Sequence, residues 1–511
     1  MLNPSLFLNV LKNNKIFFFF LLIVILLGNS GCSERAQSQA IRFGLTTEPV
    51  TLDPRFATDA VSDRINRLIY ARLIDFDQRF QVIPKLAVWE KVSPIHYRFT
   101  LQEEYRVFHN GMKLTSADVK ASYESVLDQS NASPHRSSLN MIEKIVTPNT
   151  NKIDFFLNKA DPLFPGRLTL GIMPAELIEA NYPFNKKPIG SGPLKFNQWP
   201  QGGKLLLERV SDQQSIQFIT VKDPTVRALK LVRGELDLFQ GDIPQEMFAW
   251  VAEQVNVKTE TNKGNTFSYL GFNLEDPVVG QLQVRQAIAN ALNRDDIIKF
   301  VFKGAARTAD AIFTPEHWVG NPDLQGYHQD QKKAKTLLTE LGYDKENPLK
   351  ITYKTSNDPF RIRLATVIQY QLKQVGIELK IQSYDWGTFY GDIKAGNFQM
   401  YSLSWVGLKL PDIFRYIFHT DSIPPEGANR GRFSNVHIDQ LISQAELETD
   451  QLQQAKRYKK MQALLLEQLP YIPLWYENSL LVQRDHLVNY QLSLDGNYDG
   501  LIRVRKNNET H

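Results

Sequence analysis

The amino-acid sequence predicts an α/β protein of several domains. Its 511 residues correspond to about three domains at roughly 150 residues each. The composition is that of a globular protein, with 42% hydrophobic and 22% charged residues. In the C-terminal half, helical periods end at glycines and alternating strands follow directly. Gly376, for example, separates a helical period from the alternation of Ile377, Leu379 and Ile381. This order of elements is typical of α/β folds.

The N-terminus predicts an export signal. Lys12 and Lys15 precede an unbroken apolar run at residues 16–27, with no acidic residue before Glu34. The run has 12 residues, about 18 Å as a helix, which is too short for a hydrocarbon core of about 30 Å. The length suits the apolar region of a signal peptide. We expect residues 1–31 to be that signal peptide.

The single cysteine, Cys32, follows the small residues at 28–31. The arrangement resembles a bacterial lipoprotein signal, in which cleavage precedes a cysteine that receives a diacylglycerol. Asn29 stands where that signal usually has leucine. We therefore expect lipidation at Cys32 and a short polar tether at residues 32–40. A plain signal peptide with an incidental cysteine and an uncleaved anchor helix are the alternatives.

The first half of the remaining chain mixes strands and helices. Residues 186–193 (KKPIGSGP) form a strong boundary signal. Helices are expected at 59–73, 117–127 and 224–232, and strands at 41–45, 97–101, 153–157, 205–210, 216–221 and 269–273. Thr115 or Ser116 is the expected N-cap of the second helix.

The second half has the clearest helical periods, each an apolar face at i, i+3 and i+4 spacing. Asn293 is a plausible N-cap, and Gly342 and Gly376 are expected helix stops. Helices are expected around 284–292, 334–341, 364–375 and from 438 to 470, and strands at 377–381, at 471–476, and near Leu481 and Ile502.

The sequence carries no local motif for catalysis. It contains no P-loop, no HExxH and no GxSxG, and no two of its nine histidines lie at i, i+3 or i, i+4. One cysteine excludes an intrachain disulfide framework and a cysteine-based zinc site. A net charge of +4 does not favour nucleic acid as a partner. We expect a protein that is not an enzyme and that holds no metal or cofactor.

Six segments, in the right order, resemble the solute-binding lipoproteins of family 5, the oligopeptide- and dipeptide-binding components of ABC importers. The resemblance runs over nearly the whole mature chain. The segments are EPVTLDPRFATDAVSDRINRLIYARLIDFD (48–77), IPKLAVWEKVSPIHYRFTLQEEYRVFHNGMKLTSADVKASYESVL (83–127), GSGPLKF (190–196), LVRGELDL (231–238), FNLEDPVVGQLQVRQAIANALNRDDII (272–298) and AKTLLTELGY (334–343).

The resemblance implies a bilobed periplasmic-binding-protein fold of type II, with two lobes joined by a hinge and an extra domain inserted in the first lobe. Lobe I would combine residues 41–75, 188–273 and 484–511. The inserted domain would be 76–187, and lobe II would be 274–483.

In this family the ligand is buried between the lobes, so the resemblance also implies site residues. The expected contacts are Glu48, Pro49 and Val50 before the LDP turn, Ser404, Trp405, Val406 and Gly407 on the tryptophan-containing strand, Asn497 and Tyr498 near the C-terminus, and, more weakly, Tyr269, Asn273 and Trp386. Peptide-binding members usually carry an aspartate three residues after this tryptophan, which pairs with the ligand's α-amino group. This chain has Leu408 there, followed by Lys409.

The resemblance therefore implies a lipid-anchored receptor on the periplasmic side of the cell envelope. It would capture a peptide or peptide-like solute and deliver it to a separate permease and ATPase of an ABC importer. We expect a monomer attached to the membrane through Cys32, without nucleic acid. Open alternatives are a non-peptide solute (a metal complex, haem, an oligosaccharide or an opine-like molecule), a scaffold or chaperone lipoprotein, and an exported hydrolase.

Overall fold

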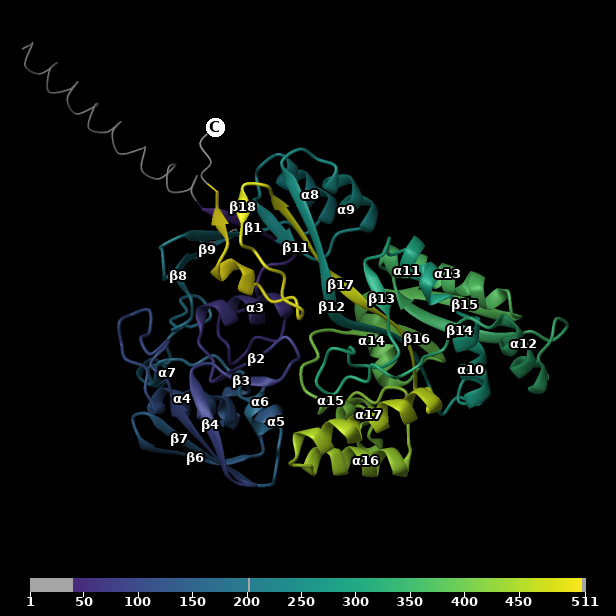
Figure 1. Ribbon diagram of the computed structural model, residues 1–511, viewed down its shortest axis with the longest axis horizontal. Coiled ribbons are helices and arrows are strands. Elements are labelled where there is room, and N and C mark those ends of the chain that lie inside the picture. Colours follow the sequence, from purple (N-terminus) through teal and green to yellow (C-terminus); the bar gives the residue numbers. More distant parts are fainter. Residues whose placement is uncertain (1–39, 201–202, 508–511) are drawn as a thin grey trace, which may run out of the picture.

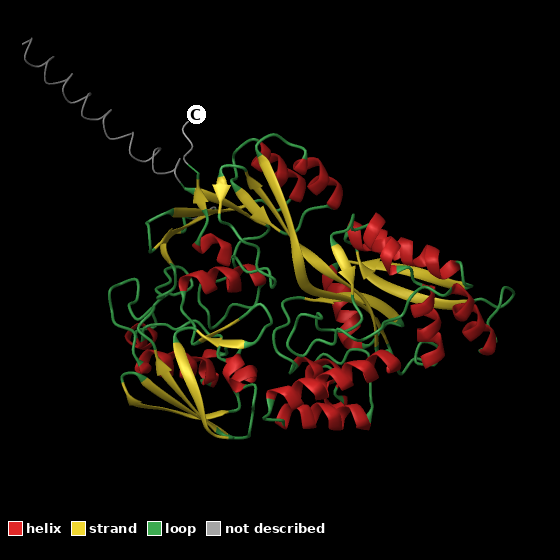
Figure 2. Ribbon diagram, viewed as in Figure 1, coloured by secondary structure: helices red, strands yellow, loops and turns green. Residues whose placement is uncertain are grey.

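The computed structural model describes residues 40–200 and 203–507. The predicted signal peptide and Cys32 lie outside the described residues. Within them, one large sheet extends through the molecule, and a smaller sheet forms a separate body beside it (Figures 1 and 2). We keep the names lobe I, inserted domain and lobe II for the residue ranges given above, and these domain limits remain a proposal.

The large sheet has eleven strands among the described residues. Its order is β15 (Ile377–Tyr384), β14 (Leu349–Ser356), β16 (Met400–Trp405), β12 (Val257–Phe272), β17 (Tyr471–Arg484), β11 (Leu238–Gln240), β1 (Ile41–Leu45), β10 (Ser215–Thr220), β9 (Lys204–Arg209) and β8 (Leu194–Gln198), with β13 (Ala306–Thr308) pairing with β17. Strands from both lobes therefore belong to one hydrogen-bonded sheet.

Strands β12 and β17 join the two lobes. They pair antiparallel from Val257 with Arg484, both in the lobe I range, to Gly271 of lobe I with Tyr471 of lobe II. At about 3.3 Å per residue, the 16 residues of β12 span roughly 50 Å. Figure 1 shows both strands running from the upper part of lobe I into lobe II.

Both joining strands are longer than the sequence predicts. We expected strands at 269–273, at 471–476 and near Leu481, but β12 begins at Val257, and β17 is one continuous strand from Tyr471 to Arg484 that includes Leu481. The first half of β12, VKTETNKGNT, has little apolar alternation because much of it is exposed. The ladder is also irregular between Asn262 and Thr266. The pairing with β17 keeps this polar segment extended.

The core of lobe I lies around β1, where the buried side chains include Phe43, Leu68, Phe218 and Leu501. The helices here are α3 (Ala60–Ile69), α8 (Pro224–Val232) and α9 (Gln245–Ala252). The chain returns to this lobe through the two-stranded pair β18 (Leu487–Val488) and β19 (Arg505–Lys506). Between these strands, Asp499–Ile502 form a 3-10 helix, so the predicted strand near Ile502 is wrong.

A buried carboxylate, that of Asp237, contacts the first and the last strand of lobe I. The side chain of Asp237 is fully buried and accepts hydrogen bonds from the Arg42 backbone N–H and from its guanidinium, at 2.7 to 3.0 Å. Lys506 Nζ lies 3.5 Å from the same carboxylate. Burial alone would raise the pKa of Asp237, but the hydrogen bonds from Arg42 and the charge of Lys506 hold it below its ordinary value.

The inserted domain is built on the antiparallel sheet β4 (Ala87–Ser93), β5 (His96–Leu101), β7 (Lys152–Leu157) and β6 (Ile142–Asn149). Helix α4 (Ser116–Leu127) packs on this sheet, and Thr115, one of the two N-caps that the sequence predicts, forms a capping box with Asp118. Short helices follow at α5 (Arg136–Leu139), α6 (Phe164–Arg167) and α7 (Ala175–Glu179). A small pair, β2 (Ile74–Phe76) with β3 (Val82–Pro84), connects this domain to lobe I.

Lobe II buries both faces of its part of the sheet. One hydrophobic cluster includes residues of α10 (Leu282–Ala291), α11 (Arg294–Phe300), α12 (Gln331–Glu340) and α13 (Pro359–Lys373). A second cluster includes residues of α14 (Trp386–Ala395), α15 (Ile413–Phe418), α16 (Val436–Leu447) and α17 (Gln451–Gln468). The Asn293 cap is confirmed, and the predicted stops Gly342 and Gly376 have φ of +83° and +93°.

The loop that follows β16, residues 408–412, connects lobe II to the other parts. Lys409 Nζ lies 2.8 Å from Asp495 Oδ2 of lobe I. Asp412 Oδ2 lies 2.6 Å from Arg167 of the inserted domain. The Leu408 carbonyl accepts a hydrogen bond from Asn265 of β12. We call this segment the 408–412 loop.

A histidine of lobe II supports the loop. The Val319 N–H donates to His317 Nδ1, so the ring proton lies on Nε2, which donates to the Lys409 carbonyl at 3.0 Å. The ring of Phe80, from the inserted domain, stacks on His317 at 5.4 Å between centroids. Burial lowers the pKa of His317 from 6.5 to about 4.

The neutral state of His317 predicts a pH-dependent stability. A histidine whose pKa is depressed on folding contributes stability above its unfolded pKa and loses it as pH falls. The window here is from about pH 6.5 down to about 4, at up to about 1.4 kcal/mol per pH unit. The variant His317→Gln should lack this part of the pH dependence. Urea unfolding at pH 7, 6 and 5 would measure it.

His437, which is exposed at the start of α16, provides the matched control. His437→Gln should keep the pH dependence of the natural protein. An unchanged slope in His317→Gln would show that this ring does not titrate on unfolding.

Candidate functional site: a polar cavity bordered by the 408–412 loop

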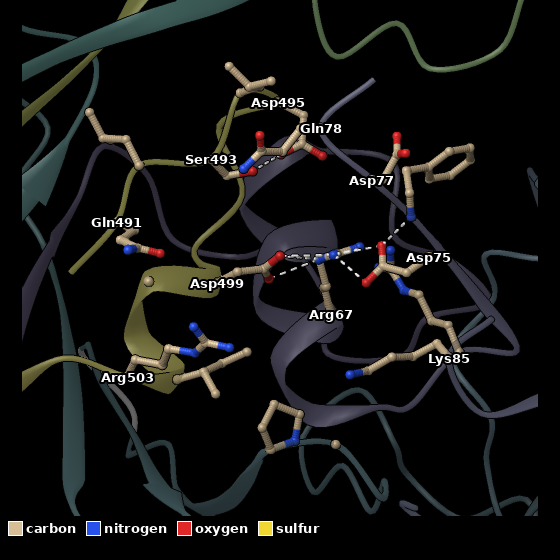
Figure 3. Close-up of a pocket in the computed structure, with 18 of the residues that line it drawn as sticks. Arg67, Asp75, Asp77, Gln78, Lys85, Gln491, Ser493, Asp495, Asp499 and Arg503 are labelled. Carbon is tan, nitrogen blue, oxygen red and sulfur yellow. Dashed lines mark hydrogen bonds and ion pairs between the residues drawn. The ribbon is translucent and has the colours of Figure 1, made fainter. Parts of the chain in front are cut away.

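A cavity of about 690 Å³ lies between lobe I and the inserted domain. Its wall comes from α3, β2 and its following turn, and the C-terminal segment 489–503, with Asn262 from β12. The lining side chains with ionisable groups or amides are Arg67, Arg72, Asp75, Asp77, Gln78, Lys85, Asn262, Asn489, Gln491, Asp495, Asp499 and Arg503. Figure 3 shows that this wall is strongly polar.

Arg67 lies at the centre of the wall and is held by two carboxylates. Its guanidinium donates to both oxygens of Asp75 and of Asp499, at 2.7 to 3.0 Å (Figure 3). Burial alone would lower the pKa of Arg67, but the hydrogen bonds and charges of the two carboxylates raise it above its ordinary value. The triad ties α3 to β2 and to the C-terminal segment, which are distant in sequence. It shapes the cavity and leaves Arg67 no unpaired charge for a solute.

Asp495 forms the border with lobe II. It accepts hydrogen bonds from Ser493 Oγ, from Asn497 Nδ2 and from the Asn497 backbone N–H. Lys409 lies against it and also over the ring of Phe76, at 5.4 Å. Burial alone would raise the pKa of Asp495, but Lys409 and Ser493 hold it below its usual range. The carboxylate of Asp495 is therefore charged, and it forms an ion pair with Lys409 of lobe II.

Other polar groups of the wall are less constrained. Gln78 and Gln491 are exposed. Asp77 uses Oδ1 to accept the backbone N–H groups of Arg79 and Gln81. Lys85 lies over the ring of Tyr105, at 4.6 Å, and donates to its hydroxyl at 3.3 Å. The wall thus offers donors and acceptors of both signs.

None of the twelve residues predicted to contact the ligand lines this cavity. In lobe I, Glu48 and Val50 are exposed and Pro49 is buried. Asn497 is buried and reaches the site only through Asp495. Tyr498 is buried against Phe43, with ring centroids 4.7 Å apart.

The other predicted residues lie at the end of β16, on or just after β12, and at the start of α14. Ser404 bonds to Ser268 at 2.7 Å, Trp405 is partly exposed, Val406 is exposed, and Gly407 has a φ of +67°. Trp386 begins α14 and is exposed, whereas Tyr269 is fully buried. Asn273 donates to the Gly396 carbonyl in a turn. Their contact with a ligand stays a prediction.

The sequence reasoning did not identify the ionic groups of the cavity. Arg67 and Asp499 are 432 residues apart, and no local pattern signals their pairing. The segment LDGNYDG did carry two aspartates, Asp495 and Asp499, beside the residues that we selected. These two acidic residues were the only feature of the sequence that could have indicated the ionic groups of the cavity.

The described residues contain no group of three or more His, Cys, Asp or Glu side chains placed to hold a metal ion. Among the same residues, no helix has the length and apolar character to cross a membrane.

Comparison with known proteins identifies the family to which the chain belongs. Residues 81–422 match the model of the bacterial extracellular solute-binding proteins, family 5 Middle. The oligopeptide-binding protein AppA of Bacillus subtilis is 26% identical over 484 residues, which cover 88% of each chain.

Two solved structures have the same fold. The periplasmic binding protein DppA from Helicobacter pylori, in complex with the peptide STSA, superposes with a TM-score of 0.75 and 26% identity, covering 92% of this chain and 98% of its own. NikZ from Campylobacter jejuni, in complex with Ni(L-His), gives 0.77 and 24%, covering 92% and 99%. The predicted bilobed α/β binding-protein fold is confirmed. The chain therefore belongs to the family 5 extracellular solute-binding proteins, as the sequence segments had indicated.

Proposed function

We propose that the protein is a lipid-anchored receptor that captures a peptide or peptide-like solute between its lobes and delivers it to an ABC importer. Proteins of this family bind solutes and are not enzymes, and they act outside the cytoplasm. The observation that carries the proposal is the polar cavity of about 690 Å³ beside the border of the two lobes. Its volume is in the range of small-molecule sites, about 300–1,000 Å³.

The relatives support a peptide as the first candidate, because AppA is an oligopeptide-binding protein and DppA was solved with a peptide. A second candidate is a solute without a free α-amino group. The observation that favours it is Leu408, which replaces the aspartate that usually pairs with that amine. In addition, Lys409 already occupies the nearby Asp495 carboxylate.

Capture requires that the solute favour the closed arrangement, so it must contact both lobes. The 408–412 loop brings lobe II to the rim of the cavity, where Lys409 contacts Asp495 and Phe76. The solute and this loop would stabilise the same closed state. Closure and capture are therefore one equilibrium in this proposal.

The solute itself is identified by mass spectrometry. Protein purified natively from its own cell envelope and then denatured should release a stoichiometric small molecule. The same molecule, added back, should raise the midpoint of thermal unfolding, because a ligand of the folded state stabilises it by mass action. Peptides with free amines as the only released species would refute the second candidate. A protein that neither carries nor responds to any solute would refute the receptor.

The membrane anchor depends on Cys32, the first residue of the predicted tether. Cys32→Ser should abolish incorporation of labelled fatty acid and move the protein from the membrane to the soluble envelope fraction. Asn29→Leu, which restores the usual residue of a lipoprotein signal, should leave the anchored protein in place. Membrane retention of the Cys32→Ser protein would indicate an uncleaved anchor helix instead.

Lys409 should govern closure. Lys409→Met leaves the Asp495 carboxylate partly buried without its cation, so the closed state loses stability. We expect solute affinity to fall by at least about tenfold, about 1.4 kcal/mol, and the unliganded protein to have a larger radius of gyration by small-angle X-ray scattering. Lys380→Met, at an exposed position of β15, is the matched control and should change neither. Unaltered affinity and size in Lys409→Met would exclude this role for the ion pair.

A further inference from the structure

A second polar centre lies in lobe II, away from the cavity wall. Arg430, in the loop before α16, has only 8% of its surface exposed. Its guanidinium lies against the rings of Trp405 and Tyr390, at 4.9 and 5.3 Å from their centroids. Arg430 therefore lies next to Trp405, the last residue of β16.

Arg430 has no anionic partner among the described residues. It donates to two hydroxyls, of Tyr390 at 3.0 Å and of Tyr269 at 3.4 Å. An arginine presents five N–H donors and requires acceptors for them when it is buried. A buried cation without a carboxylate is costly to the folded protein. Among the described residues the side-chain acceptors of this guanidinium are therefore neutral hydroxyls.

The other buried arginines of the described chain differ from Arg430. Each of them donates to a carboxylate or to backbone carbonyls. They are Arg72 (to Asp63), Arg106 (to Leu114), Arg209 (to Asp212, Leu501 and Val504), Arg227 (to Val221 and Asp242), Arg285 (to Val279, Gly280 and Gln468) and Arg294 (to Ala309, Pro473, Tyr327 and Asp310). A structural role accounts for those contacts, whereas Arg430 faces aromatic rings and hydroxyls only.

The surroundings of Arg430 contain one further unused donor. Trp405 Nε1, buried, has no hydrogen-bond partner among the described residues. The hydroxyls of Tyr401 and Tyr471 interact with that of Tyr269, and both rings pack against its ring, with centroids 5.9 and 3.9 Å away. An unsatisfied donor beside a cation favours a ligand atom that accepts hydrogen bonds and carries negative charge.

Two exposed aromatic rings pack on the rings that contact Arg430. Trp386, 58% exposed, stacks on Tyr390 with its ring inclined by 8° and its centroid 5.4 Å away. Tyr416, 48% exposed, packs edge-on against Trp405. Exposed aromatic rings therefore pack against both of the rings that flank the guanidinium. They suit the body of a solute whose acidic group points inward.

We propose that Arg430 binds a carboxylate of the solute, flanked by Trp405 and Tyr390, and that the receptor therefore selects solutes with an acidic group. This inference rests on the proposed receptor function and narrows its substrate class. The carboxylate supplies an anionic acceptor in lobe II, while the rest of the solute extends toward the rim that Lys409 and Asp495 form. A solute bound in this way contacts lobe II through its acid rather than through its amine.

The test compares an acid with its neutral isostere. Phenylacetate and phenylacetamide share size and ring and differ in charge, and quenching of tryptophan fluorescence reports their binding to the full-length protein. We expect the natural protein to bind phenylacetate at least about tenfold more tightly than phenylacetamide. Arg430→Gln should abolish this preference, and Arg430→Lys should keep a reduced one because an ammonium lacks the planar fork.

Arg363→Gln, which removes an exposed arginine of the same lobe, is the control and should retain the preference. Circular dichroism and the unfolding midpoint without probe establish that each variant is folded. Equal binding of the two probes by the natural protein overturns the inference even if Arg430→Gln fails to fold. A preference that persists in folded Arg430→Gln overturns it as well.

The released solute separates this inference from the receptor function. A native solute without any acidic group would overturn the role of Arg430 and leave the receptor standing. A protein without solute or importer partner, but with the phenylacetate preference, would overturn the receptor and keep the anion site.

Discussion

The pairing of β12 with β17 is the constraint on which the rest of the molecule depends. β12, in the lobe I range, pairs with β16 of lobe II, and β17, in the lobe II range as far as Gln483, pairs with β11 of lobe I, so the two strands link the sheets of both lobes. A break in this ladder would expose backbone donors and acceptors in both lobes at once. Relative motion of the lobes is therefore confined to bending and twisting of the pair. The irregular stretch between Asn262 and Thr266, where the ladder is already interrupted, is the natural position for that bend.

The two lobes treat their buried charges in opposite ways. In lobe I, Arg67 is paired with Asp75 and Asp499, and Asp495 is paired with the incoming Lys409. In lobe II, Arg430 is surrounded by aromatic rings and hydroxyls and has no carboxylate within reach among the described residues. Paired charges shape a cavity without favouring a charged solute in it. A buried charge without an ionic partner favours a solute that carries the opposite charge. Under the two proposals above, the specificity for the solute would lie on the lobe II side, and the lobe I wall would provide a general polar surface.

Local sequence rules accounted for much of the fold and little of the site. The caps at Thr115 and Asn293 and the stops at Gly342 and Gly376 follow from short-range hydrogen bonding and backbone freedom, so they could be read from neighbouring residues. The first half of β12 could not, because its polar residues become a strand only through pairing with β17. The ionic centres were also inaccessible, since Arg67 with Asp499 and Lys409 with Asp495 meet only after the chain has folded. Resemblance to the family directed attention to Trp405, and the neighbouring Arg430 carried no sequence signal of its own.

The contact between Arg167 and Asp412 has a kinetic consequence. This pair, 2.6 Å apart, joins the inserted domain to lobe II, and neither residue lines the cavity. In the receptor proposed above, this pair would break each time the lobes separate, whatever solute they enclose. The residence time of a bound solute is then set partly by residues that never touch it, because dissociation waits for opening. A permease that accelerates unloading would have to weaken this outer contact, and it could do so without reaching the solute at all.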